Sequence, residues 1–318
     1  MRRLIFLYTL LILGAGSAMA DDYPSHPIRL IVPFAPGGAV DPIARLIANP
    51  LGERLGKPIV IYDRGGAGGS IGMDEVAKSP PDGYTLLLDH SGMTYMPGLY
   101  RTLPFDPVKD FAGIITAVAG FYVLAVNNDL PVKSVAELIA YAKANPGKLN
   151  YGAVIGTPPH MCGEMFKHIT GANIVFVPYK TASQATIDVL AGQMNMTFEG
   201  TTAIVPHIKS GEVRALAVTS PTRIPEIPDV PTMDELGYPG MPPDSWQAIV
   251  APAGTPAAVV AKINKVVNEG LATPELQNKL KQLGGEPQPK SVADFAAFIA
   301  DQYKRWGEVI RITGVTLN

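Results

Sequence analysis

Residues 28–55 read IRLIVPFAPGGAVDPIARLIANPLGERL, and this stretch decides the fold class. Residues 28–33 form a short, mostly apolar run of strand length, and residues 41–55 place apolar side chains at helical spacing. The loop between them holds two adjacent glycines, which suit a tight connection. A strand joined to a helix by a short loop is the repeating unit of sheets that are flanked by helices.

The same alternation of strand-length and helix-length patterns continues along the chain. Further strands are predicted at residues 59–62, 84–88, 122–126, 149–154, 174–177, 194–198, 213–218 and 246–250. Further helices are predicted at residues 70–78, 134–144, 158–170, 183–190, 256–271, 274–283 and 291–312. The grouping indicates an α/β protein with two parallel or mixed sheets, each flanked by its own helices.

The domain organisation depends on the strand predicted at residues 246–250, which follows a proline-rich stretch. If this strand returns to the first sheet, the chain crosses twice between two lobes, and a double crossing makes a hinge over a cleft. We therefore expect lobe 1 to consist of residues 21–121 and 248–318, and lobe 2 to consist of residues 122–247.

The N-terminus has the order of a secretory signal. Arg2 and Arg3 precede an apolar run at residues 4–13, and Ala18-Met19-Ala20 ends the segment in small residues. An uncleaved anchor or a buried helix are the alternatives, but the run is short for a bilayer. We expect cleavage after Ala20 and a soluble periplasmic protein.

Composition excludes several classes of function. The chain has 26 basic and 28 acidic residues, so it lacks the basic surface that nucleic acids require. Its single cysteine, Cys162, cannot form an internal disulfide, and no cysteine at the cleavage point could carry a lipid. Cys162 lies in an apolar helical stretch and is expected to be a small buried side chain.

The loop PFAPGGAVDP at residues 33–42 could hold an anion. Asp41 followed by Pro42 is typical of an N-cap and a first helical position, and unpaired amides at such a helix start can bind a carboxylate. A tight turn with a capping aspartate is the alternative. Asp41 and Arg45 are four residues apart, so an ion pair would account for both, and a direct contact of Asp41 with ligand is the second choice.

The second half of the chain repeats this pattern in YGAVIGTPPH at residues 151–160. Thr157 is expected to cap the next helix, Pro158 to begin it and Gly171 to end it. Two helix N-termini would then face each other across the cleft, so that an acidic protein could still bind an anion. His160 would lie near such a ligand, or it could be a packing histidine.

Three further loops follow predicted strands, and ligands collect at the carboxyl ends of strands in open α/β sheets. These loops are DHSG at residues 89–92, YKTAS at residues 179–183 and EGTT at residues 199–202. Lys180 could steer anions or could be a solvated charge. The histidines are scattered, so neither a metal site nor a cofactor is expected.

A hydrolase is the main alternative, because GGSIG at residues 68–72 matches the G-x-S-x-G motif around a nucleophilic serine. That motif needs the serine on a sharp turn directly after a strand. Here the predicted strand ends near Tyr62, well before Ser70, and the glycines between them predict a flexible loop. Phosphate-binding motifs for nucleotides are missing from the sequence.

Many motifs in a fixed order resemble the periplasmic receptors of tripartite tricarboxylate transporters, also called Bug-type or TctC binding proteins. The resemblance covers nearly the whole mature chain. The matching stretches are VPFAPGG at residues 32–38 with Asp41 and Ala44-Arg45, GAGGSIG at 66–72, PDGYTL at 81–86, YGAVIGTPPH at 151–160, VPYK at 177–180, RALAV at 214–218, PT at 231–232, APAGTP at 251–256 and RWG at 305–307.

The resemblance implies a two-lobed, type II-like periplasmic binding protein that closes on a small carboxylate. It implies a monomer without enzymatic activity that docks on a small and a large membrane subunit, and a glycine-rich loop in which Ser70 is not catalytic. In the family the loops matching residues 37–41 and 156–160 hold one ligand carboxylate. The predicted ligand-binding residues are Phe34, Gly37, Gly38, Ala39, Asp41, Ser91, Gly156, Thr157, His160, Thr181 and Glu199.

The sequence departs from the family pattern at positions that bear on the ligand. Ala39-Val40 and Ala153 stand where hydroxyl residues are common, and Glu199 stands where a shorter acid is typical. Fewer hydroxyls predict a less polar ligand, such as an aromatic or aliphatic dicarboxylate. A ligand sensor that presents the same closed form to a signalling protein is a further alternative.

Overall fold

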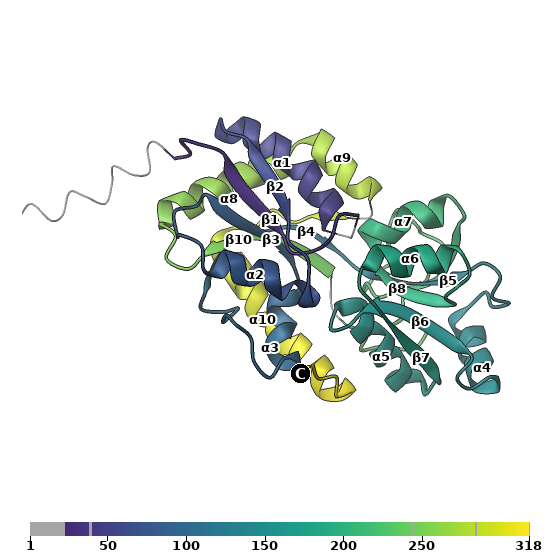
Figure 1. The fold of residues 1–318 in the computed structure, drawn as a ribbon. Coiled ribbons are helices and arrows are strands. Elements are labelled where there is room, and N and C mark those ends of the chain that lie inside the picture. The colour runs from purple at the N-terminus through teal and green to yellow at the C-terminus, as the bar shows by residue number, and fades with distance from the viewer. Residues whose placement is uncertain (1–22, 38–39, 243–244, 284, 318) are drawn as a thin grey trace, which may run out of the picture.

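The computed structural model describes residues 23–317, except residues 38–39, 243–244 and 284 (Figure 1). The predicted signal peptide and its cleavage after Ala20 lie outside the described residues. Figure 1 shows two groups of elements side by side, one containing β1 to β4 and β10 and the other containing β5 to β8. Each group is built around its own sheet, as predicted.

The first sheet has the strand order β11-β4-β10-β3-β1-β2. Strands β1, β2 and β3 are mutually parallel, whereas β10, β4 and β11 each run antiparallel to a neighbour. The strands span β1 (Ile28–Val32), β2 (Ile59–Asp63), β3 (Thr85–His90), β4 (Phe111–Gly120), β10 (Ser245–Pro252) and β11 (Glu286–Pro287).

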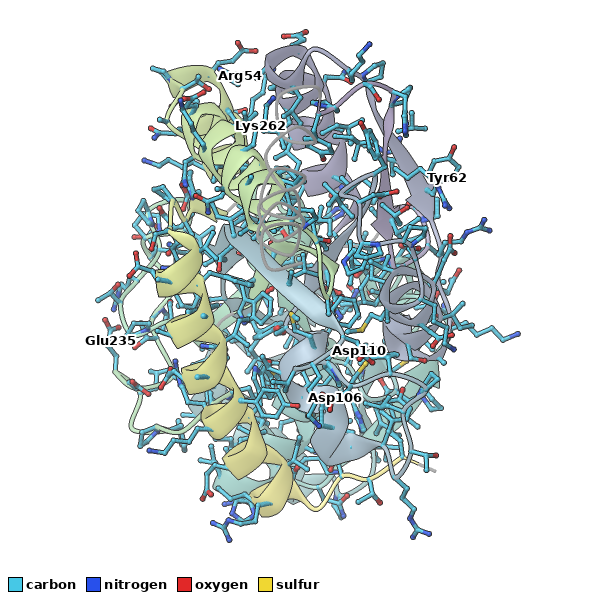
Figure 2. The ribbon with its side chains drawn as sticks, turned by 90° about the vertical axis from the view of Figure 1, so that its left-hand side faces the viewer. Arg54, Tyr62, Asp106, Asp110, Glu235 and Lys262 are labelled. Atoms are coloured by element: carbon cyan, nitrogen blue, oxygen red, sulfur yellow. The ribbon has the colours of Figure 1, made fainter. Side chains whose placement is uncertain are left out.

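Helices cover both faces of the first sheet because both faces are apolar. One face packs against α1 (Asp41–Leu55), α8 (Ala257–Leu271) and α9 (Pro274–Gln282). The other face packs against α2 (Ser70–Ala77), α3 (Gly92–Leu99) and α10 (Val292–Thr313). In Figure 2 α10 lies in yellow along this flank, and Lys262 of α8 is labelled near the top.

The second sheet has the strand order β7-β6-β8-β5-β9, with β6 parallel to β7 and β8, and β5 antiparallel to β8 and β9. The strands span β5 (Tyr122–Asn127), β6 (Leu149–Val154), β7 (Ile174–Tyr179), β8 (Met196–Gly200) and β9 (Val213–Val218). One face packs against α4 (Val135–Ala144) and α5 (Pro158–Thr170), and the other against α6 (Ala182–Leu190) and α7 (Thr201–Lys209).

The chain passes between the sheets twice. Strand β4 ends at Gly120 and β5 begins at Tyr122, so the first passage is a single residue. Strand β10 returns to the first sheet and pairs with β3 and β4. It begins at Ser245, which pairs with Gly120, so the predicted lobe boundary between residues 247 and 248 falls inside this strand.

The C-terminal segment lies against both groups of elements. Met161 and Met165 of α5 share a core with Trp306 of α10. Beyond α10, the amide of Leu317 donates a hydrogen bond to the carbonyl of Leu99, 2.7 Å away. The Leu317 side chain packs on Gly156, where an added Cβ would lie 2.3 Å from its Cδ1. Residues near the C-terminus therefore contact the loop that follows β6.

None of the described helices is both long and apolar enough to span a bilayer.

Candidate ligand-binding cleft

A cavity of about 710 Å³ lies between the two sheets, and both contribute to its walls. From the first sheet it is lined by Phe34, Ala35, Pro36, Val40, Asp63, Gly65, Gly66, Ala67, Gly68, Gly69, His90, Ser245 and Gln247. From the second sheet it is lined by Tyr122, Val154, Ile155, Thr157, Pro158, Pro159, Tyr179, Lys180, Thr181, Ala182, Ser183, Glu199 and Gly200.

Strand direction explains why these residues meet. The carboxyl ends of the parallel strands β1, β2 and β3 share one edge of the first sheet, and the loops that follow them line the cavity. The carboxyl ends of β6, β7 and β8 likewise share one edge of the second sheet, and the loops that follow these strands also line the cavity. The two edges face each other, and this arrangement makes the cleft.

The two walls approach each other closely at the rim. An added Cβ on Gly37 of the first wall would lie 3.5 Å from the Ser183 hydroxyl of the second. One on Gly68 would lie 3.9 Å from the carbonyl oxygen of Ile155. Gly37 and Gly68 have φ angles of +85° and +68°, which glycine adopts without strain. The backbone at Gly37 and Gly68 therefore lies close to residues of the opposite wall.

Four of the predicted ligand residues line the cavity, namely Phe34, Thr157, Thr181 and Glu199. Gly37 lines a second cavity of about 260 Å³ that also reaches Glu199. Gly38 and Ala39 lie outside the described residues. The other predicted residues, Asp41, Ser91, Gly156 and His160, are absent from the lining in the described structure.

Asp41 holds the first loop together. The helix α1 begins at Asp41 with Val40 at the N-cap position, so the predicted capping role is wrong. One carboxylate oxygen of Asp41 instead accepts a hydrogen bond from the amide of Gly37, 2.9 Å away. The other oxygen lies 2.8 Å from Nε of Arg45, the ion pair that the spacing indicated. Asp41 is buried, and its hydrogen bond to Gly37 stabilises the loop between β1 and α1.

The start of α5 differs from the prediction in a similar way. Thr157 occupies the N-cap position, with Pro158 first and Gly171 ending the helix, as predicted. The Thr157 hydroxyl, however, donates to the carbonyl of Val154 at 2.7 Å and caps no amide. Pro158 and Pro159 have no N–H groups, so this helix start offers few donors to an anion.

His160 is a packing histidine in this structure. Its ring stacks on Phe176 with centroids 4.0 Å apart, and Nδ1 lies 3.2 Å from the amide of Gly156. Burial lowers the pKa of His160 to about 4, so the imidazole is neutral at neutral pH. Gly156 faces Leu317 and Leu99, away from the cavity lining.

The start of α6 offers the amides that α5 lacks. Thr181 is its N-cap, and the threonine hydroxyl accepts a hydrogen bond from the amide of Gln184 at 3.3 Å. Ala182 and Ser183, the first two helical residues, line the cavity. From the sequence, this loop was a lining candidate with Thr181 as a predicted ligand-binding residue. The pattern Thr181-x-x-Gln184 is a capping box and would have located the helix start.

Ser91 and Tyr122 lie at the base of the cleft, close to the passage between the sheets. Ser91 is fully buried, and its hydroxyl lies beside the phenol of Tyr122, as does that of Ser245. Burial raises the pKa of Tyr122, which lines the cavity as a neutral phenol. Ser91 therefore supports a lining residue without reaching the cavity itself.

The cavity carries little formal charge. Besides the phenols of Tyr122 and Tyr179, the ionisable groups of the described lining are Asp63, His90, Lys180 and Glu199. Burial lowers the pKa of His90 to about 4 and raises that of Glu199 to about 7. Lys180 is thus the single cation of the described lining at neutral pH. The groups that favour an anion in the cleft are therefore this one ammonium group and the backbone dipoles, while the carboxyl groups of Asp63 and Glu199 also face the cavity.

Ser70 does not have the geometry of an activated nucleophile. It is the first residue of α2, and residues 64–69 separate it from β2. Its side chain is buried and stands outside the cavity lining, and within the described residues its hydroxyl has no hydrogen bond to a histidine. The described part of the chain also holds no group of His, Cys, Asp and Glu residues arranged to bind a metal.

Comparison with known proteins places this fold and cleft in a family. Residues 43–315 match the family model described as the tripartite tricarboxylate transporter family receptor. The chain belongs to this receptor family. The resemblance inferred from the sequence motifs is thereby confirmed.

Relatives in this receptor family cover nearly the whole chain. Protein BugT of Bordetella pertussis is 38% identical, over 100% of this chain and 99% of its own length. The R. palustris protein Rpa4515 with adipate superposes with a TM-score of 0.89 at 37% identity, covering 93% of this chain and 99% of that chain. MatC from Rhodopseudomonas palustris with bound malate has a TM-score of 0.85 at 29% identity, covering 91% and 100%.

The solved receptors confirm the predicted two-lobed binding-protein fold with two mixed sheets flanked by helices. Another of them is the periplasmic binding protein BugD, with a TM-score of 0.87 and 38% identity.

Proposed function

We propose that this receptor binds a small organic carboxylate in the cleft and delivers it to a tripartite membrane transporter. The observation that carries the proposal is the cavity between two sheets, which is lined by strand-end loops in a chain of the receptor family. Similar structures contain adipate and malate. The partners would be the small and large membrane subunits, and the receptor would act in the periplasm as a monomer after cleavage at Ala20.

One ligand carboxylate is received at the start of α6. The amides of Ala182 and Ser183 lie at the positive end of the helix, where backbone N–H groups have no helical acceptor. Lys180, two residues earlier, adds the single positive charge of the described lining. Lobe closure would bring the loop at Gly37 against this point, because Gly37 already lies beside Ser183.

The rest of the cavity suits an apolar ligand body. Phe34 and Val40 line the first wall, and Ile155, Pro158 and Tyr179 line the second. Burial of methylene groups against such side chains contributes about 0.8 kcal/mol for each group. An aliphatic or aromatic dicarboxylate fits this combination of an anion site and apolar walls.

Calorimetric titration with aliphatic, aromatic and amino-acid carboxylates tests the receptor function. We expect saturable one-to-one binding of one carboxylate class and loss of its uptake in cells that lack the gene. No binding of any carboxylate in the panel, together with ester hydrolysis that disappears in Ser70→Ala, would instead establish the hydrolase. Intact uptake in the deletion strain combined with a lost transcriptional response to the ligand would establish a sensor.

The role of α6 is tested by removing one backbone amide. Thr181 has φ −136° and ψ 147°, which is compatible with a following proline, and proline is favoured at the first position of a helix. Ala182→Pro should therefore keep the fold while removing one N–H donor. Hydrogen bonds to charged groups contribute about 1.5–3 kcal/mol, so carboxylate affinity should fall by at least about tenfold.

The matched control is Val292→Pro. Val292 is the first residue of α10, follows the N-cap Ser291, and is exposed outside the cavity lining. This variant should bind the carboxylate like the wild type. Equal affinity in Ala182→Pro and the wild type would contradict the anion site at α6.

A further inference from the structure

Glu199 forms a wall between two cavities. It lies at the end of β8 and is only 4% exposed. It lines both the main cavity and the smaller cavity of about 260 Å³, whose walls come from Gly37 and Pro42 and from helices α6 and α7. A carboxyl group in this position can touch a ligand on one side and exchange protons with solvent through the space on the other.

The surroundings of Glu199 hold few compensating charges. One carboxylate oxygen accepts a hydrogen bond from the amide of Gly200 at 2.8 Å. Tyr122 on β5, Cys162 on α5 and Thr186 on α6 lie near Glu199. The other titratable groups with side chains on the same cavities are Asp63, His90, Tyr179 and Lys180 in the main cavity and His207 in the second.

These neighbours leave the Glu199 carboxylate unpaired within the described structure. Burial raises the pKa of Tyr122 and of Cys162, so both groups are neutral. Lys180 is exposed, and Nδ1 of His207 lies 2.8 Å from a carboxylate oxygen of Glu212. A buried carboxylate without a cation is costly, so the neutral acid is favoured.

Glu199 also lies at a suitable separation from the anion site. Its carboxyl group is beside Thr186, which follows Ala182 by four residues, or about 6 Å along α6. A ligand whose first carboxylate lies at the start of α6 would therefore bring a second carboxylate, a few carbons away, against Glu199.

We propose that Glu199 recognises the second carboxylate of a dicarboxylate ligand as a neutral carboxylic acid, so that binding takes up one proton from solvent. The inference rests on the proposed function, because it assumes that the cleft binds carboxylates. The acid O–H donates to the ligand carboxylate in a charge-assisted hydrogen bond, while the ionised form would repel it.

The sign of the pH effect follows from this geometry. In the empty receptor the pKa of Glu199 is about 7, and a neighbouring ligand anion raises this pKa further. Proton uptake on binding is then small below about pH 6 and approaches one proton near pH 8. Affinity for the dicarboxylate should fall by up to about tenfold per pH unit above pH 7.

The test is calorimetry between pH 6 and 8.5 in two buffers of different ionisation enthalpy, with adipate and malate as probes. Wild-type protein should take up protons as described, whereas Glu199→Gln should bind a dicarboxylate without pH dependence. Hexanoate, which lacks the second carboxylate, should bind with little pH dependence in both proteins. Glu269→Gln, an exposed change on α8, is the matched control for removal of a negative charge and should behave like the wild type.

Each outcome decides the proposal. Dicarboxylate binding without proton uptake in the wild type, or with the same uptake in Glu199→Gln, would overturn it. Dicarboxylate affinity that rises with pH would also overturn it, because binding would then release a proton instead of taking one up. Failure of both dicarboxylates to bind at any pH would count against the proposed function itself. If Glu199→Gln does not fold, Glu199→Asp should keep the proton uptake.

Discussion

At the scale of single residues, the ionisable side chains of the cleft are controlled by burial. His90 and His160 are neutral because burial lowers their pKa values to about 4, whereas Asp89 and Glu199 have pKa values raised to about 7. At pH 7 the two histidines therefore add no positive charge, and each of the two acids is only about half ionised. Anion binding must depend on backbone donors and on Lys180.

The raised pKa of Glu199 also predicts how stability depends on pH. Its folded pKa of about 7 exceeds the ordinary value of 4.5, so the folded state binds the proton more tightly than the unfolded state. The resulting destabilisation is absent below pH 4.5 and grows until about pH 7. Glu199→Gln should match the wild type at pH 4.5 and be more stable at pH 8, by up to about 3 kcal/mol.

Urea unfolding of the ligand-free proteins at the two pH values measures this difference. The exposed variant Glu269→Gln should show a smaller change between the two pH values. An equal stability difference between Glu199→Gln and the wild type at both pH values would mean that folding does not shift the pKa of Glu199.

The candidate site was only partly predictable at this scale. Loops at strand ends identified Phe34, Thr181 and Glu199, because ligand loops gather at one edge of a parallel sheet. The sequence left the roles of Asp41 and His160 open, because a motif does not show which way a side chain points. Their contacts with Gly37 and Phe176 come from tertiary packing.

At the scale of elements, the strands and helices with clear periodicity were predicted well, and the missed elements include α3, β4 and α7. Helix α3 contains Pro97 and is buried from Gly92 to Met96, so it shows no amphipathic pattern. Strand β4 is rich in alanine and glycine and almost wholly buried. Helix α7 contains Pro206 and several β-branched residues. In each case burial on all sides or a helix-breaking residue removes the local signal.

Two glycines within helices predict opposite effects of the same substitution. An added Cβ on Gly163 of α5 would lie 2.2 Å from the ring of Tyr151, which is fully buried, whereas one on Gly307 of α10 would meet nothing within 4 Å. Gly307→Ala should stabilise the protein by about 0.5–1 kcal/mol through helix propensity. Gly163→Ala should destabilise it by about 1–3 kcal/mol through overpacking.

Thermal and urea unfolding of both variants measure these changes, and each variant controls for the other. Stabilisation by Gly163→Ala would show that Tyr151 can move aside, in spite of its hydrogen bonds to Glu164 and to the carbonyl of His160.

At the scale of the whole molecule, the two sheets are connected by the chain passages and also by the C-terminal segment. Leu317 packs on Gly156 while its amide bonds to Leu99, so the contact joins the two sides of the cleft. Leu317→Ala should speed ligand dissociation several-fold and leave global stability within about 1 kcal/mol, because the side chain is partly exposed. Stopped-flow displacement of a bound carboxylate measures this rate.

Thr316→Ala is the matched control, since Thr316 is exposed and adjacent. It should release ligand at the wild-type rate. Unchanged dissociation in Leu317→Ala would mean that the C-terminal contact persists with similar energy in the open receptor.

The position of Leu317 has a practical consequence for engineering. A fluorescent protein or an affinity tag attached after Asn318 would begin two residues beyond Leu317, which packs on Gly156. Such a fusion would compete with the Leu317 contact and change the affinity that it is meant to report. Biosensors built from this receptor should therefore carry their reporters in the exposed loop around Gly147, or behind a long C-terminal spacer.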